Sequence, residues 1–108
     1  MSHITTHILD AAIGRPASDV RVVLLDDSGV ERASGTTDSN GRVTDLGPDL
    51  LSNGAYRLKF DVGAYFARTD TETFYPSVTI EFSVTDAEQH YHVPLLISPF
   101  AYSTYRGS

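Results

Sequence analysis

The sequence predicts an all-β protein, an antiparallel β-sandwich of about seven to eight short strands with one short helix. Three observations support this class. Apolar residues alternate with polar ones along most of the chain, turn signals separate these segments at regular spacing, and neither an internal repeat nor a linker-like boundary is visible. The 108 residues are enough for one core, so residues 1–108 are expected to form a single domain.

The first half of the chain contains three predicted strands. Residues 4–10 form the first, and the second is the β-branched run 20–25, which stands between two loops. The segment 26–29 ends in Ser-Gly and predicts a turn into a third strand at 30–37. A further turn is expected at 38–41, because Asn-Gly supplies the positive φ of a tight hairpin, so Arg42 is expected just past a hairpin tip.

The second half contains the clearest strand, residues 55–62, in which apolar residues at 56, 58, 60 and 62 alternate with charged residues at 57, 59 and 61. The alternation then breaks, because Tyr65, Phe66 and Ala67 are grouped as on one turn of a helix, and a short helix is expected at 63–70. The remaining predicted strands cover residues 77–85, 90–97 and 101–105.

Composition limits the partners and the chemistry. A formal net charge of -6 argues against nucleic acid or an anionic membrane as a partner, because both require basic patches. The absence of cysteine excludes disulfides, thiol nucleophiles and cysteine metal sites. Neither a signal peptide nor a membrane span is visible, so a cytoplasmic location is expected.

Three separated motifs carry a family resemblance. They are Thr6-His7-Ile8-Leu9-Asp10 with Gly14-Arg15-Pro16-Ala17, then Thr37-Asp38-Ser39-Asn40-Gly41-Arg42, and finally Tyr105-Arg106-Gly107-Ser108 with His90 and His92 upstream. Together they resemble the transthyretin-related 5-hydroxyisourate hydrolases, enzymes of purine (urate) breakdown. The resemblance covers about residues 6–108.

This resemblance implies a transthyretin-like (prealbumin-like) sandwich that opens the lactam ring of 5-hydroxyisourate to give 2-oxo-4-hydroxy-4-carboxy-5-ureidoimidazoline. It further implies that no metal and no other cofactor is needed, and that the enzyme is a homotetramer, a dimer of dimers with active sites in a central channel. The apolar run 95–102 fits such an interface, although ordinary core packing in a monomer is the alternative.

The resemblance also selects the catalytic residues. Because side chains alternate on a strand, His90 and His92 share one face, and His3 and His7 share a face of the first strand. In the transthyretin-like arrangement the first and penultimate strands are neighbours, which would bring His7 and His92 together. A solvated strand histidine, or a zinc site with an open position, is the alternative, but no zinc motif or suitably spaced carboxylate accompanies them.

Each of these residues receives an expected role. His92 is expected to act as general base on water, since an imidazole with a pKa of ~6.5 suits that task at neutral pH. His7 would orient the water or protonate the ring nitrogen, and Arg42 would stabilise charge developing on oxygen. The resemblance also implies that Ser108 would offer a hydroxyl and a terminal carboxylate to the site. The residues expected to bind the substrate are His90, Tyr105 and Arg106.

Two noncatalytic readings compete with the hydrolase. Short prealbumin-like modules that serve as spacers or adhesion domains share the turn patterns but have no need of the histidines or the Tyr-Arg-Gly-Ser segment. A carrier of a hydrophobic aromatic ligand, like transthyretin itself, is disfavoured because His7, Arg42 and His92 would be desolvated and unpaired against an apolar ligand.

Overall fold

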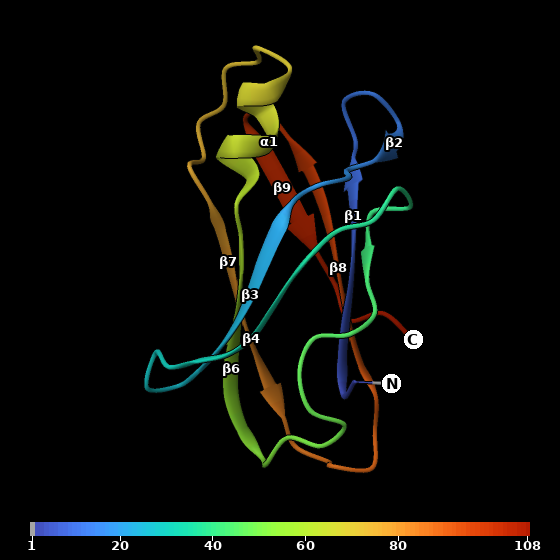
Figure 1. Ribbon diagram of the computed structural model, residues 1–108, viewed down its shortest axis with the longest axis vertical. Coiled ribbons are helices and arrows are strands. Elements are labelled where there is room, and N and C mark those ends of the chain that lie inside the picture. Colours follow the sequence, from blue (N-terminus) through green and yellow to red (C-terminus); the bar gives the residue numbers. More distant parts are fainter. Residues whose placement is uncertain (1) are drawn as a thin grey trace.

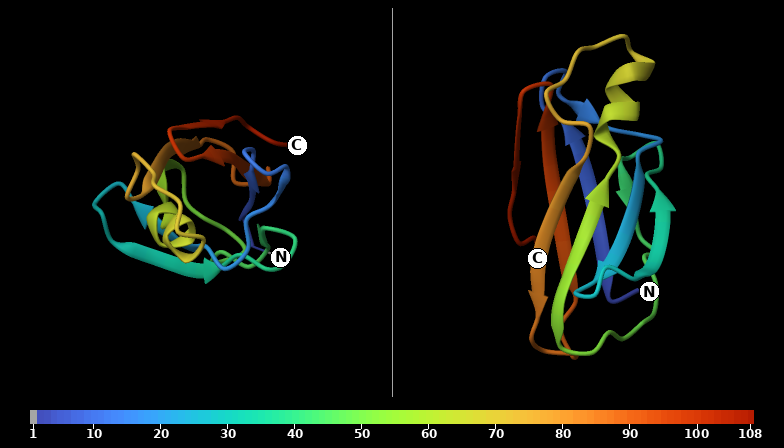
Figure 2. Two further views of the ribbon diagram at one scale, coloured as in Figure 1. Left: turned by 90° about the horizontal axis from the view of Figure 1, so that it is seen from above. Right: turned by 90° about the vertical axis from the view of Figure 1, so that its left-hand side faces the viewer.

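The computed structural model describes residues 2–108 as two facing β-sheets with a helix at one end (Figures 1 and 2). The first sheet contains, in spatial order, β2 (Arg15–Pro16), β1 (Ile4–Asp10), β8 (Tyr91–Ser98) and β9 (Ala101–Thr104), and β5 (Arg42–Val43) also pairs with β1. The second sheet contains β4 (Glu31–Thr36), β3 (Arg21–Asp26), β6 (Gly54–Phe60) and β7 (Val78–Val84). The expected sandwich with one short helix is confirmed, and the long strands differ from their predicted ranges by no more than two residues at either end.

One strand pair departs from the antiparallel expectation. β1 and β8 run parallel, with Thr5 opposite His92 and His7 opposite Pro94, whereas every other pair of described strands is antiparallel. Parallel neighbours need a long crossover connection. Here the whole second sheet lies between β1 and β8 in the sequence, so the connection is easily long enough and the first sheet is mixed.

The core lies between the two sheets and is built from every second residue of their strands. Ile8 of β1 and Leu95 of β8 are fully buried, and they face a second sheet whose Leu58 and Phe60 are also fully buried. Each such side chain contributes roughly 1.5–3 kcal/mol when it is removed from water. This burial fixes which face of β1 and β8 is inward, and therefore which residues of these strands point outward.

The turn at 38–41 forms as expected, but the hairpin prediction is wrong. Gly41 has a φ of 74°, and Asp38 closes the turn by accepting the backbone N–H groups of Asn40 and Arg42. The strands on either side, however, belong to different sheets, because β5 pairs with β1. The backbone N–H of Ile8 donates to the carbonyl of Gly41 at 2.7 Å. The turn thus carries the chain across the sandwich and delivers Arg42 to the first strand.

The helix α1 (Val62–Arg68) closes one end of the sandwich (Figure 1). It begins after Asp61, whose carboxylate accepts the N–H of Ala64, and it buries Val62, Tyr65 and Phe66. The hydroxyl of Tyr65 donates to a carboxylate oxygen of Asp10 at 2.8 Å. Burial and this hydrogen bond raise the pKa of Tyr65 to about 12. The contact ties the helix to the end of β1.

Candidate functional site

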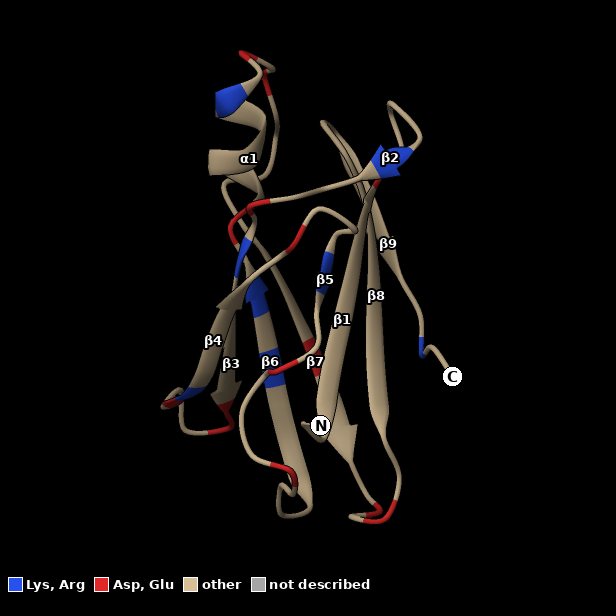
Figure 3. Ribbon diagram, turned by 45° about the vertical axis from the view of Figure 1, so that its right-hand side comes forward, with Lys and Arg blue, Asp and Glu red and all other residues tan. Residues whose placement is uncertain are grey.

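The outward face of the first sheet collects the residues singled out by the motifs. Ile8 of β1 points into the core, so Thr5 and His7 point to the opposite face. Across the sheet His7 lies opposite Arg42 of β5, and Thr5 lies opposite His92 of β8. Residues directly opposite each other on neighbouring strands share a face. Arg42, His7 and His92 therefore occupy one surface, with β5 beside β1 as drawn in Figure 3.

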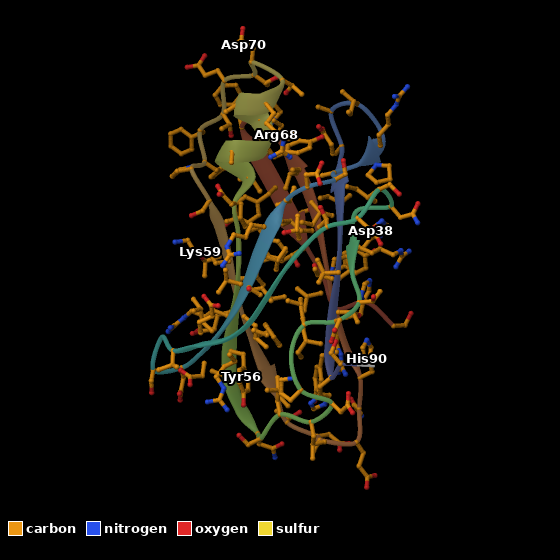
Figure 4. The ribbon with its side chains drawn as sticks, viewed as in Figure 1. Asp38, Tyr56, Lys59, Arg68, Asp70 and His90 are labelled. Carbon is orange, nitrogen blue, oxygen red and sulfur yellow. The ribbon has the colours of Figure 1, made fainter. Side chains whose placement is uncertain are left out.

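A shallow hollow of about 230 Å³ opens on this surface. Its lining residues are Thr5, Thr6, Arg42, Thr44, His90, His92 and Ser108. Four of the predicted site residues are thus brought together from three separate parts of the sequence. His90 precedes β8 and is exposed, and Figure 4 shows it on the same side of the molecule as Asp38 of the turn that carries Arg42.

The surroundings of His7 and His92 favour their neutral forms. Partial burial, followed by the nearby Arg42 guanidinium, lowers the pKa of His92, and the neighbouring His7 and His90 lower it further. Burial and Arg42 also lower the pKa of His7, while the backbone of Asn40 and the charge of Asp38 partly oppose this. Both imidazoles are consequently unprotonated at neutral pH and can accept a proton.

Thr5 connects two of these histidines and was not identified by sequence reasoning. Its Oγ1 lies 2.8 Å from Nε2 of His90 and 2.9 Å from Nδ1 of His92. The side chain is buried, with 8% of its surface exposed, between the two rings. A threonine on a strand carries no sequence signal of function. Only its register opposite His92, across a pairing of distant segments, assigns it to the site.

Gly107 packs directly on the ring of His92. Its backbone N–H donates to the carbonyl of His92 at 2.9 Å, and the two residues form an isolated antiparallel bridge. A Cβ at position 107 would lie 2.5 Å from Cδ2 of His92 and 3.1 Å from Cγ of Pro94. No side chain fits there. The Tyr-Arg-Gly-Ser segment thus needs its glycine for close approach to the imidazole, and the same bridge places Ser108 at the hollow.

Tyr105 and Arg106 lie on a second hollow, of about 370 Å³, which His92 also lines. The Arg106 guanidinium donates to Oε1 of Gln89 at 2.7 Å and sits 4.6 Å from the centre of the Tyr91 ring. These contacts anchor the segment after β9 to the loop before β8. This hollow is larger, and its other lining residues come from β7, β8, β9 and the residue after β7. Arg42 lines only the smaller hollow, and His7 lines neither of the two.

His3 is separate from this surface, despite its expected shared face with His7. It lies in a bend before β1, with 4% of its surface exposed, and both ring nitrogens are engaged. Nδ1 accepts the backbone N–H of Leu51 at 2.9 Å, and Nε2 lies 2.6 Å from the carbonyl of Gln89. The ring also makes an edge contact with Tyr91. His3 is a structural residue that joins three segments.

Within residues 2–108 no group of three or more His, Cys, Asp or Glu side chains is arranged to hold a metal ion. Over the same residues no helix has both the length and the apolar character needed to cross a bilayer.

Comparison with known proteins places the chain in a family. The HIUase/Transthyretin family matches residues 4–107. The 5-hydroxyisourate hydrolase of Caulobacter vibrioides is 43% identical, with each chain covered completely. The structure of Klebsiella pneumoniae 5-hydroxyisourate hydrolase superposes with a TM-score of 0.90 at 39% identity, covering 97% of this chain and 98% of that one. Sea bream transthyretin in complex with thyroxine gives a TM-score of 0.89 at 30% identity, covering 96% and 93%. This chain belongs to the HIUase/Transthyretin family.

Proposed function

We propose that this protein hydrolyses 5-hydroxyisourate, by direct attack of water on a ring carbonyl, to give 2-oxo-4-hydroxy-4-carboxy-5-ureidoimidazoline. The relatives named 5-hydroxyisourate hydrolase support the substrate. The observation that carries the proposal is the grouping of His7, Arg42 and His92 on one outward face, where Arg42 and His92 also line the smaller hollow. These side chains supply a base, a second imidazole and a fixed positive charge, and no cofactor is invoked.

His92 acts as the general base. It is neutral at neutral pH because burial and Arg42 lower its pKa, so its free nitrogen takes a proton from water as the oxygen attacks the carbonyl carbon. The carbonyl π electrons move onto the oxygen, which becomes an oxyanion. General-base assistance of this kind accelerates a reaction by roughly 10² to 10⁴.

Arg42 stabilises the oxyanion. Its guanidinium is planar and permanently charged, and it can pair with two neighbouring oxygens of an electron-poor ring. Its place opposite His7, at the end of a turn fixed by Asp38, holds the charge beside the base. Removing one such donor typically lowers the turnover number by about 10² to 10³.

The other predicted residues complete the site. His7 orients the water or gives a proton to the ring nitrogen when the C–N bond breaks, and Ser108 borders the hollow beside Arg42. His90, Tyr105 and Arg106 are assigned to substrate binding. For Tyr105 and Arg106 this assignment depends on the second hollow, which meets the first at His92.

A homotetramer, built as a dimer of dimers with the sites in a central channel, accompanies this function. Within the run 95–102, Leu95 and Ile97 are buried in the core, but Phe100 and Tyr102 are 63% and 42% exposed. Exposed aromatic side chains of this kind are typical of interfaces. Light scattering is expected to give four chains per particle. A monomer with full activity would contradict the assembly. A cytoplasmic location stays a prediction.

The noncatalytic alternatives do not account for the charged and imidazole side chains on the outward face of the first sheet. A spacer or adhesion module has no use for two unprotonated histidines and an arginine on one face. A carrier of an apolar aromatic ligand would bury Arg42, His7 and His92 against groups that cannot pair with them, which costs free energy for each unsatisfied polar group.

The test is the decay of 5-hydroxyisourate generated from urate with urate oxidase. Ultraviolet absorbance is followed with and without the protein, because the substrate also decays spontaneously. We expect a rate that increases in proportion to protein concentration, and a product identified by NMR as the ring-opened ureidoimidazoline. A decay rate equal to the spontaneous one at every protein concentration would overturn the proposal.

A further inference from the structure

We propose that Thr5 is a positioning residue that fixes the tautomer of His92 and links it, through one shared hydroxyl, to the exposed imidazole of His90. This inference rests on the proposed hydrolysis with His92 as the base. Thr5 does not touch the reacting atoms. It acts by deciding which nitrogen of His92 carries a proton before the reaction starts.

The hydroxyl of Thr5 has one proton to donate. Oγ1 lies within hydrogen-bond distance of two ring nitrogens, 2.8 Å from His90 Nε2 and 2.9 Å from His92 Nδ1. It can donate to only one of them, so the other must donate to it. When both rings are neutral, the two tautomers are therefore coupled, and only two arrangements satisfy both contacts.

The surroundings of His92 keep its ring in this orientation. Gly107 packs against the Cδ2 and Cγ edge, so closely that a Cβ there would be 2.5 Å from Cδ2. The hydroxyl of Thr5 is hydrogen-bonded to Nδ1, and the backbone of His92 forms a β-bridge with Gly107. The nitrogen left for chemistry is Nε2. It is free to accept a proton only in the arrangement where Nδ1–H donates to Thr5, and there Thr5 donates to Nε2 of His90.

The same hydrogen bonds give the proton a route out of the site. When Nε2 of His92 takes a proton from water, the ring becomes cationic beside Arg42, whose charge opposes this. His92 then passes its Nδ1 proton to Oγ1 of Thr5, while Thr5 passes its own proton to Nε2 of His90. The positive charge moves to His90, which is exposed to solvent. In this scheme His7 orients the water, and His92 is the proton donor. Reversal of the two transfers accompanies donation of the Nε2 proton to the departing ring nitrogen, so a proton moves from water to that nitrogen and both rings end neutral.

Three variants test this in the decay assay. Thr5→Val keeps the shape and the strand preference but removes the hydroxyl, Thr5→Ser keeps the hydroxyl, and Thr79→Val makes the same change on β7 of the other sheet. We expect Thr5→Val to lower kcat by about 10- to 100-fold, the cost typical of losing a partner that orients a histidine, with little change in KM. Thr5→Ser should recover most of kcat, and Thr79→Val should match wild type.

A second readout needs no activity. In ¹⁵N spectra of the wild-type protein at neutral pH, His92 should carry its proton on Nδ1, and Thr5→Val should shift it toward the Nε2–H form. A wild-type His92 protonated on Nε2 would overturn the proposal, as would a Thr5→Val protein with unchanged kcat and spectrum. If Thr5→Val does not fold, the proposal is tested by the wild-type spectrum and by the turnover of Thr5→Ser. A wild-type protein without hydrolase activity refutes the proposed function alone, because the spectrum still tests Thr5.

Discussion

Two histidines near the same end of the sandwich, His3 and His92, have opposite surroundings. Both ring nitrogens of His3 are engaged, one by the N–H of Leu51 and the other at the carbonyl of Gln89. His92 has Nδ1 at Thr5, and its Nε2 has no protein partner among the described hydrogen bonds. Tyr91, which precedes His92 in the sequence, makes an edge contact with the His3 ring.

The difference shows what makes a histidine reactive in this fold. Backbone groups engage both ring nitrogens of His3, so neither is left for a substrate and the ring serves the fold. His92 is held by Thr5 on one side and by Gly107 along another, which orients the ring while leaving one nitrogen for the substrate. The reactive ring is therefore the one that is held in orientation but keeps one nitrogen available for the substrate. The predictions below test that contrast, in order of decreasing effect.

Apart from removal of the base itself, the largest expected effect is that of Arg42→Lys. Lysine keeps the charge that lowers the pKa of His7 and His92, but it loses the planar fork that pairs with two oxygens. We expect kcat to fall by about 10², within the range for loss of an oxyanion donor, while the histidine titrations stay close to wild type. Steady-state decay kinetics and ¹H NMR titration measure the two quantities. Wild-type turnover in Arg42→Lys would refute the bidentate role.

The next effect concerns Gly107→Ala. The added methyl group would lie 2.5 Å from Cδ2 of His92, so the ring or the segment 105–108 must move. A displacement of about 1 Å at a reacting group can lower the rate by up to about 10²-fold. We expect a lower kcat with little change in the thermal midpoint, since Gly107 is partly exposed at the surface. Gly29→Ala, at an open turn of the other sheet, is the control for activity. Normal kcat in Gly107→Ala would show that His92 is not held by this contact.

The smallest effect is a pair of pKa shifts in opposite directions. Asp38 raises the pKa of His7, so Asp38→Asn should lower it, because removal of a negative charge disfavours the imidazolium. Arg42 lowers the pKa of both His7 and His92, so Arg42→Gln should raise both. Asp38→Asn should leave the pKa of His92 unchanged. ¹H NMR titration of the two histidines in the wild type and in both variants measures these shifts. A rise of the His7 pKa in Asp38→Asn would contradict the assigned electrostatics.

The same shifts predict the acid limb of the activity. In the free enzyme the pKa values of His7 and His92 lie below 6.5, so kcat/KM should be insensitive to pH around neutrality. It should fall as the pH decreases through the lowered values, because protonated imidazoles cannot accept a proton. The pH profile of kcat/KM measures this. An acid limb centred above 6.5 would mean that another group controls the reaction.

Much of the fold and part of the site could be predicted from the sequence. Alternation of period two identified the long strands and the shared face of His90 and His92, and Asn40-Gly41 identified the turn before Arg42. The parallel pairing of β1 with β8 was not predictable from these patterns, because alternation indicates a strand and its faces but not the direction of a distant partner.

The remaining parts of the site depend on contacts between distant segments. Thr5 became a site residue only through its register with His92, 87 positions away in the sequence. His3 appeared to share a face with His7 because the bend before β1 is not visible in the pattern of residues. The contact of Arg106 with Gln89 likewise joins two loops, whose relative positions depend on the packing of the whole sandwich.

The most direct measurement applies one substitution at two positions. His92→Asn and His3→Asn are compared with wild type for kcat in the 5-hydroxyisourate decay assay and for the free energy of unfolding in urea. We predict that His92→Asn loses about 10² or more in kcat with little loss of stability. His3→Asn should lose about 1–3 kcal/mol of stability, because its shorter side chain leaves buried groups of Leu51 or Gln89 unpaired, while the folded protein keeps its kcat. Full turnover in His92→Asn, or a large loss of kcat in folded His3→Asn, would contradict the assignment of the reactive face.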